Sequence, residues 1–178
     1  MATITMSTNS ASTSNNAGTG NKRLRGAITV LQNDIDMADA VLQNGGTALA
    51  AADIIQAIAV PTNTMILHAG IKVISAMEGT TTDSGLLLGI TGTDVDIFSA
   101  AFDYDGASVG DHTTAVLSGG SADNLPVFTA AADTIDVEID ASSGTITGGV
   151  IRVYAICIIM DDVTQSGSAA EVDRDLLA

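Results

Sequence analysis

The strongest constraint on the fold is a strict alternation of apolar and acidic residues late in the chain. Ile135, Val137 and Ile139 alternate there with Asp136, Glu138 and Asp140. Successive side chains of a β-strand point to opposite faces of a sheet, so a period of two residues predicts a strand with one buried face. The segment therefore indicates a sheet that packs on a core on one side and meets water on the other.

Several other segments are also typical of strands. Residues 150–160 form the longest apolar run, which only Arg152 interrupts. At this length the run is too short for a membrane helix, which needs ~20 residues, and it predicts a central strand buried on both faces. Shorter apolar runs, separated by turns rich in Gly, Asp, Ser and Thr, lie at 54–60, 65–67, 71–74, 86–90 and 94–98. We therefore predict an all-β protein, an antiparallel β-sandwich or jelly roll.

The region between residues 27 and 52 is ambiguous. Its apolar residues fit a helical stripe, while the alternation from Asp34 to Met37 favours extended chain, which we prefer. The stripe would consist of Leu31, Ile35, Ala38 and Leu42. Residues 48–52 are predicted to form one helical turn.

Composition divides the chain into three parts. Residues 2–20 are nearly all Ser, Thr, Asn, Ala and Gly, and such a segment buries too little apolar surface to order by itself. We predict an extended N-terminal arm at 1–25, a β-sandwich domain at 26–162 and a C-terminal tail at 163–178. Ser168 to Glu171 match a capping box, which predicts a short helix at 172–177 in that tail.

The charge balance restricts the possible partners. The 178 residues include 6 basic and 21 acidic ones, a formal net charge of −15. Such a chain repels phosphate backbones, and its five aromatic residues provide few stacking surfaces, so we expect no nucleic-acid partner. We also expect no membrane partner. The one basic cluster, Lys22, Arg23, Leu24 and Arg25, fits either an anchor on an acidic partner surface or a solvated linker.

One candidate nucleophile stands out in the sequence. Gly106 to Gly110 match the G-x-S-x-G pattern around Ser108, and His112 follows closely. That pattern works when the serine sits on a sharp turn between a buried strand and a helix. The flanking residues, Asp103 to Asp105 and Asp111 to Thr113, provide neither element. We therefore interpret the match as chance and predict that the protein is not an enzyme.

The remaining polar candidates do not form a known site. Paired carboxylates occur at Asp94/Asp96 and Asp103/Asp105, and whether either pair binds calcium stays open, because an EF-hand register through Asp105 lacks suitable ligands. His68 is expected to be a packed or hydrogen-bonded residue. Cys157, inside an apolar run, is expected to be a small buried hydrophobe. We predict no metal and no cofactor.

Several segments together resemble a known family. They follow the expected strands and turns over roughly residues 52–160, at 52–64, 69–74, 88–96, 132–137 and 149–155. They resemble segments of capsid decoration (cement) proteins of tailed bacteriophages, of the type found in marine and cyanobacterial phages. The resemblance implies an antiparallel β-sandwich, a homotrimer, and a position on the outer capsid surface where capsomers of the major capsid protein meet.

The function expected from this resemblance is structural. The protein would bind the outside of the head, clamp neighbouring major capsid protein subunits and stabilise the virion against internal pressure. Lys22, Arg23, Leu24 and Arg25 would belong to a capsid-binding arm. A tail, fibre or knob component of the virion is the first alternative. A secreted binding module is the second, although no leader pattern opens the sequence.

Overall fold

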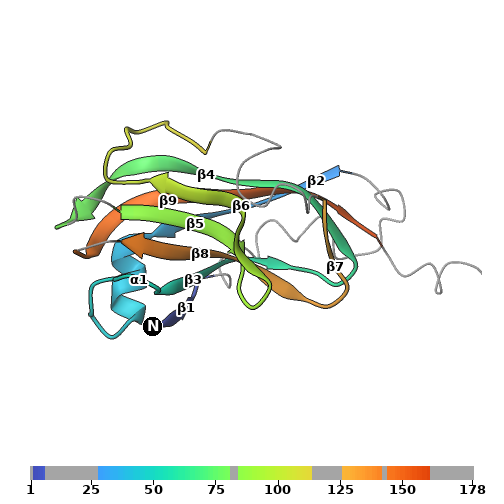
Figure 1. Cartoon of the computed structure of the whole chain (residues 1–178), viewed down its shortest axis with the longest axis horizontal. Helices are drawn as coiled ribbons and strands as arrows, with labels where there is room; N and C mark the ends of the chain where they lie inside the picture. Colours follow the sequence, from blue (N-terminus) through green and yellow to red (C-terminus); the bar gives the residue numbers. More distant parts are fainter. Residues whose placement is uncertain (1, 7–27, 81–83, 114–125, 142–143, 161–178) are drawn as a thin grey trace, which may run out of the picture.

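The computed structural model describes residues 2–6, 28–80, 84–113, 126–141 and 144–160. Two β-sheets pack face to face, and one short helix, α1 (Met37–Gln43), lies at one end of the sandwich (Figure 1). Sheet A consists, in spatial order, of β1 (Thr3–Thr5), β3 (Ile54–Val60), β8 (Asp133–Ala141), β5 (Ser84–Ile90) and β6 (Asp94–Asp103). Sheet B consists, in spatial order, of β2 (Ile28–Asp36), β9 (Ile146–Ile159), β4 (Thr64–Gly79) and β7 (Val127–Thr129).

The strand order is that of a jelly roll. Strands β2 to β9 make two four-stranded sheets, β3-β8-β5-β6 and β2-β9-β4-β7, and every pair within them is antiparallel. Eight strands wound into two packed sheets in this way define the architecture. The prediction of an all-β antiparallel sandwich is confirmed.

Side-chain alternation places the core between the sheets. Ile135, Val137 and Ile139 of β8 are fully buried, as their period of two predicts, and Leu86 and Leu88 of β5 pair with Ile139 and Val137. Strand β9 is central in sheet B, as predicted, but only one of its faces is fully buried. Its other face, which includes Tyr154, Ile156 and Ile158, is only partly covered.

The ambiguous region contains both a strand and a helix. Strand β2 extends to Asp36, so the preference for extended chain is confirmed up to that residue. The Asp36 side chain then accepts a hydrogen bond from the Ala38 amide (2.9 Å) and caps α1. The alternative helical stripe is absent, because Leu31 and Ile35 point into the core from a strand while Leu42 is exposed.

The helical turn predicted at 48–52 is wrong. Leu49 instead pairs with Ile146 through two backbone hydrogen bonds of 3.0 and 2.9 Å. Ala52 then adopts a φ of 66° in a turn that leads into β3. Leu49 is fully buried, and the extended pairing lets it fill the core, which outweighs the helical propensity of its alanine neighbours.

The first residues of the chain belong to the sandwich. Strand β1 pairs in parallel with β3, although the sequence places it within the predicted arm of residues 1–25. Ile4 and Met6 are buried, and the Met6 amide donates to the carbonyl of Gln56 (3.1 Å). The apolar residues at alternate positions make this short stretch a strand, in contrast to the polar residues that follow it.

The other predicted boundaries concern parts outside the described residues. Residues 7–25 of the predicted arm and the tail at 163–178, with its helix, both lie there. The division into arm, domain and tail therefore stays a prediction beyond the placement of β1. Among the described residues, no helix is long and apolar enough to cross a membrane.

Candidate interaction surface

One end of the outer face of sheet B carries a row of apolar side chains across all four strands. Ile28 pairs with Ile158, Ile158 pairs with Met65, and Met65 pairs with Phe128. Ile28 is 67% exposed and Phe128 is 52% exposed. Four large side chains therefore lie side by side on the surface, with no charged residue among them.

A second row lies beside the first and is also uncharged. Val30, 54% exposed, pairs with Ile156, which pairs with His68. The ring of His68 lies 5.9 Å from that of Tyr154 at a tilt of 57°. Burial lowers the pKa of His68, so its ring is neutral at neutral pH. Together, Ile28, Val30, Met65, Phe128, Ile156 and Ile158 form what we call the apolar end of sheet B.

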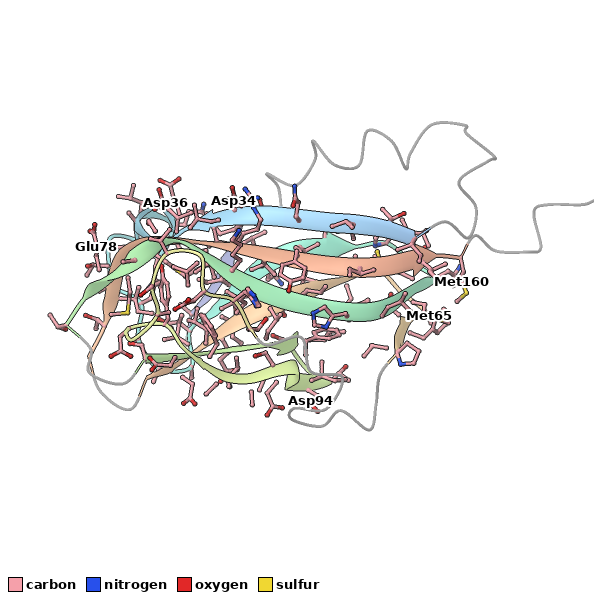
Figure 2. The ribbon with its side chains drawn as sticks, turned by 90° about the horizontal axis from the view of Figure 1, so that it is seen from above. Asp34, Asp36, Met65, Glu78, Asp94 and Met160 are labelled. Atoms are coloured by element: carbon pink, nitrogen blue, oxygen red, sulfur yellow. The ribbon has the colours of Figure 1, made fainter. Side chains whose placement is uncertain are left out.

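The opposite end of the same face is charged. Figure 2 shows Asp34, Asp36 and Glu78 there, while Met65 and Met160 mark the apolar end. Arg152 donates to both carboxylate oxygens of Asp34, from Nε (2.6 Å) and from Nη2 (2.8 Å). The hydrogen bond from Arg152 lowers the pKa of Asp34. The outer face of sheet B therefore changes from apolar to charged along the strands.

The outer face of sheet A is acidic. Asp136, Glu138 and Asp140 of β8 point away from the core and pair with Gly89, Leu87 and Gly85 of β5. Asp136 is buried beneath the turn that joins β5 to β6, and its Oδ2 accepts a hydrogen bond from the Thr91 amide (3.1 Å). The two outer faces of the sandwich thus differ in chemistry.

The predicted capsid-binding cluster, Lys22, Arg23, Leu24 and Arg25, lies outside the described residues. These residues precede β2 in sequence, and β2 begins with Ile28 at the apolar end. Their assignment to a binding arm stays a prediction.

The segment around Ser108 has loop geometry. The Ser108 amide donates to Asp111 Oδ2 (2.8 Å), and the Gly110 amide donates to the carbonyl of Val73 (2.9 Å). Residues 107–113 form turns and a short bridge beside β4, so no helix follows Ser108 within them. This contradicts the strand–turn–helix context of a nucleophile elbow and supports the interpretation of the pattern as chance.

The two acidic pairs have local structural contacts. Asp103 Oδ1 accepts from the Gly106 amide (2.9 Å), and Asp105 Oδ1 accepts from the Ser84 amide (2.8 Å), so both fix the turn after β6. The side-chain hydrogen bond with Asp94 raises the pKa of Asp96. In the described part of the chain, no group of three or more His, Cys, Asp or Glu side chains is arranged to hold a metal ion.

Cys157 is a buried free thiol. Its Sγ donates to the carbonyl of Thr29 (3.6 Å), across the pairing of β2 with β9. Burial raises the pKa of the thiol, which keeps it protonated and unreactive at neutral pH. The side chain is packed as the sequence predicts.

The apolar end of sheet B is the feature that sequence reasoning missed. The signal was present in residues 150–160, where apolar residues occupy both strand faces. Such a run predicts a strand that is buried on both faces. In the structure, the described residues fully cover only one face of this strand. A contiguous group of apolar side chains that the described residues leave exposed is a mark of an interaction site.

Comparison with known proteins adds a fold relationship. No protein-family model and no curated protein matches the sequence. The structure is similar to a chain in the capsid of Ralstonia phage GP4, with a TM-score of 0.56 and 20% identity over 90% of this chain and 100% of that chain. It is also similar to a chain in the capsid asymmetric unit of cyanophage Pam1, with a TM-score of 0.51 and 14% identity over 80% of this chain and 89% of that one. This chain therefore shares its β-sandwich fold with chains found in two phage capsids.

Proposed function

We propose that this protein is a structural component of a phage virion that binds the outside of the head. There it clamps neighbouring major capsid protein subunits and stabilises the shell against internal pressure. The observation that carries this proposal is the fold relationship, which covers 90% of this chain and the whole of a chain from the capsid of Ralstonia phage GP4. A likeness over the entire domain is stronger support than one limited to a few strands.

The features of the described residues are those that a structural role requires. The sandwich has a continuous core, and its jelly-roll sheets are paired along most of their length. The candidate nucleophile lies in a loop without the required helix, and no metal-binding group is found among the described side chains. A structural protein needs surfaces in place of an active site, and the apolar end of sheet B is such a surface. We therefore propose no enzymatic activity.

The proposed partners are the major capsid protein and further copies of the chain, with a homotrimer as the expected assembly. Lys22, Arg23 and Arg25 would pair with acidic groups of the capsid, since charge-assisted hydrogen bonds give such contacts strength and orientation. The segment would become ordered on binding, which lets a short sequence cover a long surface.

Binding to heads that lack this protein is the direct test. Purified protein is mixed with such heads, the heads are sedimented, and the bound copies per major capsid protein are counted. We expect saturable binding in a fixed ratio to the capsid subunits and a higher temperature of genome release. Binding of only a few copies at one vertex would favour a tail, fibre or knob component, and no binding would overturn the proposal.

The role of the basic cluster needs a variant that leaves β1 intact. Deletion of residues 1–25 would also remove β1, whose Ile4 and Met6 are buried in the domain, so lost binding could reflect lost stability. The triple variant Lys22→Ser, Arg23→Ser, Arg25→Ser removes only the charges. We expect weaker binding to heads with an unchanged unfolding midpoint, whereas unchanged affinity would exclude the cluster as the anchor.

A further inference from the structure

We propose that the apolar end of sheet B is the surface on which copies of this chain pack against one another. The assignment names a face for the proposed self-association, on which it rests, and it is independent of capsid binding. The occupant is a second copy of the same chain, and the contact includes Ile28 and Val30 of β2.

The geometry of the apolar end suits the centre of a protein interface. Neighbouring strands lie ~4.8 Å apart and alternate residues on one face ~6.8 Å apart, so a row across four strands and a second across three cover a compact area. Standard interfaces bury about 800 Å² per partner, with an apolar centre inside a polar rim. Gln32 and Tyr154, the next pair along β2 and β9, adjoin the second row and supply the beginning of such a rim.

Charge distinguishes the two outer faces as contact surfaces for a second copy. The chain has a net charge of −15, and the outer face of sheet A presents Glu138 and Asp140 at its surface. Two copies that met through that face would place like charges together, which costs free energy. At the apolar end, no charged side chain stands in either described row. It is therefore the face on which two equally acidic chains bring the fewest like charges together.

The β2 edge of sheet B also indicates that copies meet at the apolar end. Strand β2 is an edge strand, and exposed edges with apolar side chains tend to pair with other chains. Asp34 and Asp36 lie in the second half of β2 and protect that part of the edge, while Ile28 and Val30 occupy the unprotected first half. A contact through Ile28 and Val30 leaves Asp34 and Asp36 further along the strand, away from the apolar end.

The test compares the mass of three proteins in solution by sedimentation over a range of concentrations. The wild type is expected to associate reversibly. Val30→Asp places a charge within the apolar end and is expected to raise the dissociation constant at least about tenfold. Ala59→Asp adds the same charge at the exposed position of β3 in sheet A and is expected to leave association unchanged. Circular dichroism and thermal unfolding check that each variant is folded.

The possible results distinguish a wrong contact face from a wrong capsid function. If the wild type and Val30→Asp associate equally, the face is wrong while self-association stands. A wild type that is monomeric at every concentration overturns the assignment, and the head-binding experiment then judges the capsid role separately. Should Val30→Asp fail to fold, Phe128→Ser on β7 probes the same end from another strand, and it is expected to weaken association in the same way.

Discussion

The side chain of Asn33 joins the two sheets, and its removal should cost measurable stability. Asn33 lies on β2 with its side chain pointing inward, and only 8% of its surface is exposed. Its Nδ2 donates to the carbonyl of Met6 (3.1 Å) and to the carbonyl of Ala57 (3.0 Å). Ala57 sits at the irregularity between Gln56 and Ile58 in the pairing of β3 with β8. Asn33 therefore holds two backbone carbonyls on the side of sheet A, that of Met6 directly after β1 and that of Ala57 within β3.

The expected magnitude follows from the two hydrogen bonds. One hydrogen bond contributes roughly 1 kcal/mol net, and a buried carbonyl left without a partner costs roughly 1–3 kcal/mol. Asn33→Ala should therefore lower the free energy of unfolding by about 2–4 kcal/mol, a large share of the 5–15 kcal/mol typical of a domain. Asn33→Asp should cost more, because its carboxylate would face two carbonyl oxygens with no proton to donate.

Urea denaturation followed by circular dichroism measures this loss. Gln32→Ala is the matched control, since Gln32 is the exposed neighbour on the same strand, and its effect should stay within about 0.5 kcal/mol. Hydrogen exchange should also show faster exchange of the Met6 amide in Asn33→Ala, because β1 loses its contact with sheet B. A loss below about 0.5 kcal/mol for Asn33→Ala would refute the reasoning, since that is the range of a surface substitution.

Three further predictions concern backbone conformation, charge and reactivity. Gly149 has a φ of 107° and an added Cβ would lie 2.7 Å from the carbonyl of Ala76, so Gly149→Ala should lower the thermal midpoint more than Gly92→Ala, where φ is 85° and the space is open. The ion pair with Arg152 lowers the pKa of Asp34 in the folded state, so this pair stabilises the fold fully at pH values above the ordinary pKa of 3.8. The contribution is lost as the pH falls through the lower pKa of the folded state. Because the side chains of Arg152 and Asp34 are 38% and 47% exposed, Arg152→Gln should cost under about 1 kcal/mol at neutral pH, with the difference from wild type vanishing in acid urea titrations; a constant difference down to the most acidic pH would contradict the assignment. Cys157 should react with a thiol reagent at the rate of unfolding, monitored by absorbance, and immediate reaction in the native protein would show that the side chain is not buried.

The sequence predicts the sandwich because its strands carry strong and separate signals. The alternation at Ile135, Val137 and Ile139 and the apolar run at 150–160 survive in the structure as β8 and β9. Strand β1 escaped prediction because its three residues adjoin a long polar segment that dominates the composition. Helix α1 escaped because its only clear signal, the Asp36 cap, lies inside an alternating pattern that also fits a strand.

The candidate surface was harder to predict than the fold. Period-two patterns identify an outer face only when that face is polar, and β9 places Ile156 and Ile158 on the outside. Sequence alone cannot separate such residues from a second buried face, because burial depends on what covers the sheet. The register of β2, β9, β4 and β7 is needed to show that Ile28, Met65 and Phe128 fall in the same row.

The central place of β9 also determines when this chain can fold. Strand β9 is the last strand in the described part of the chain, and there β2 and β4 are joined in sheet B through it. During synthesis, both strands must therefore wait with open edges until β9 has left the ribosome. Pairings between such distant segments form slowly, and chains that end before β9 would expose the edges that favour aggregation. Translation products that lack β9 should consequently be insoluble or degraded, with the native sandwich assembling only in chains that include this strand.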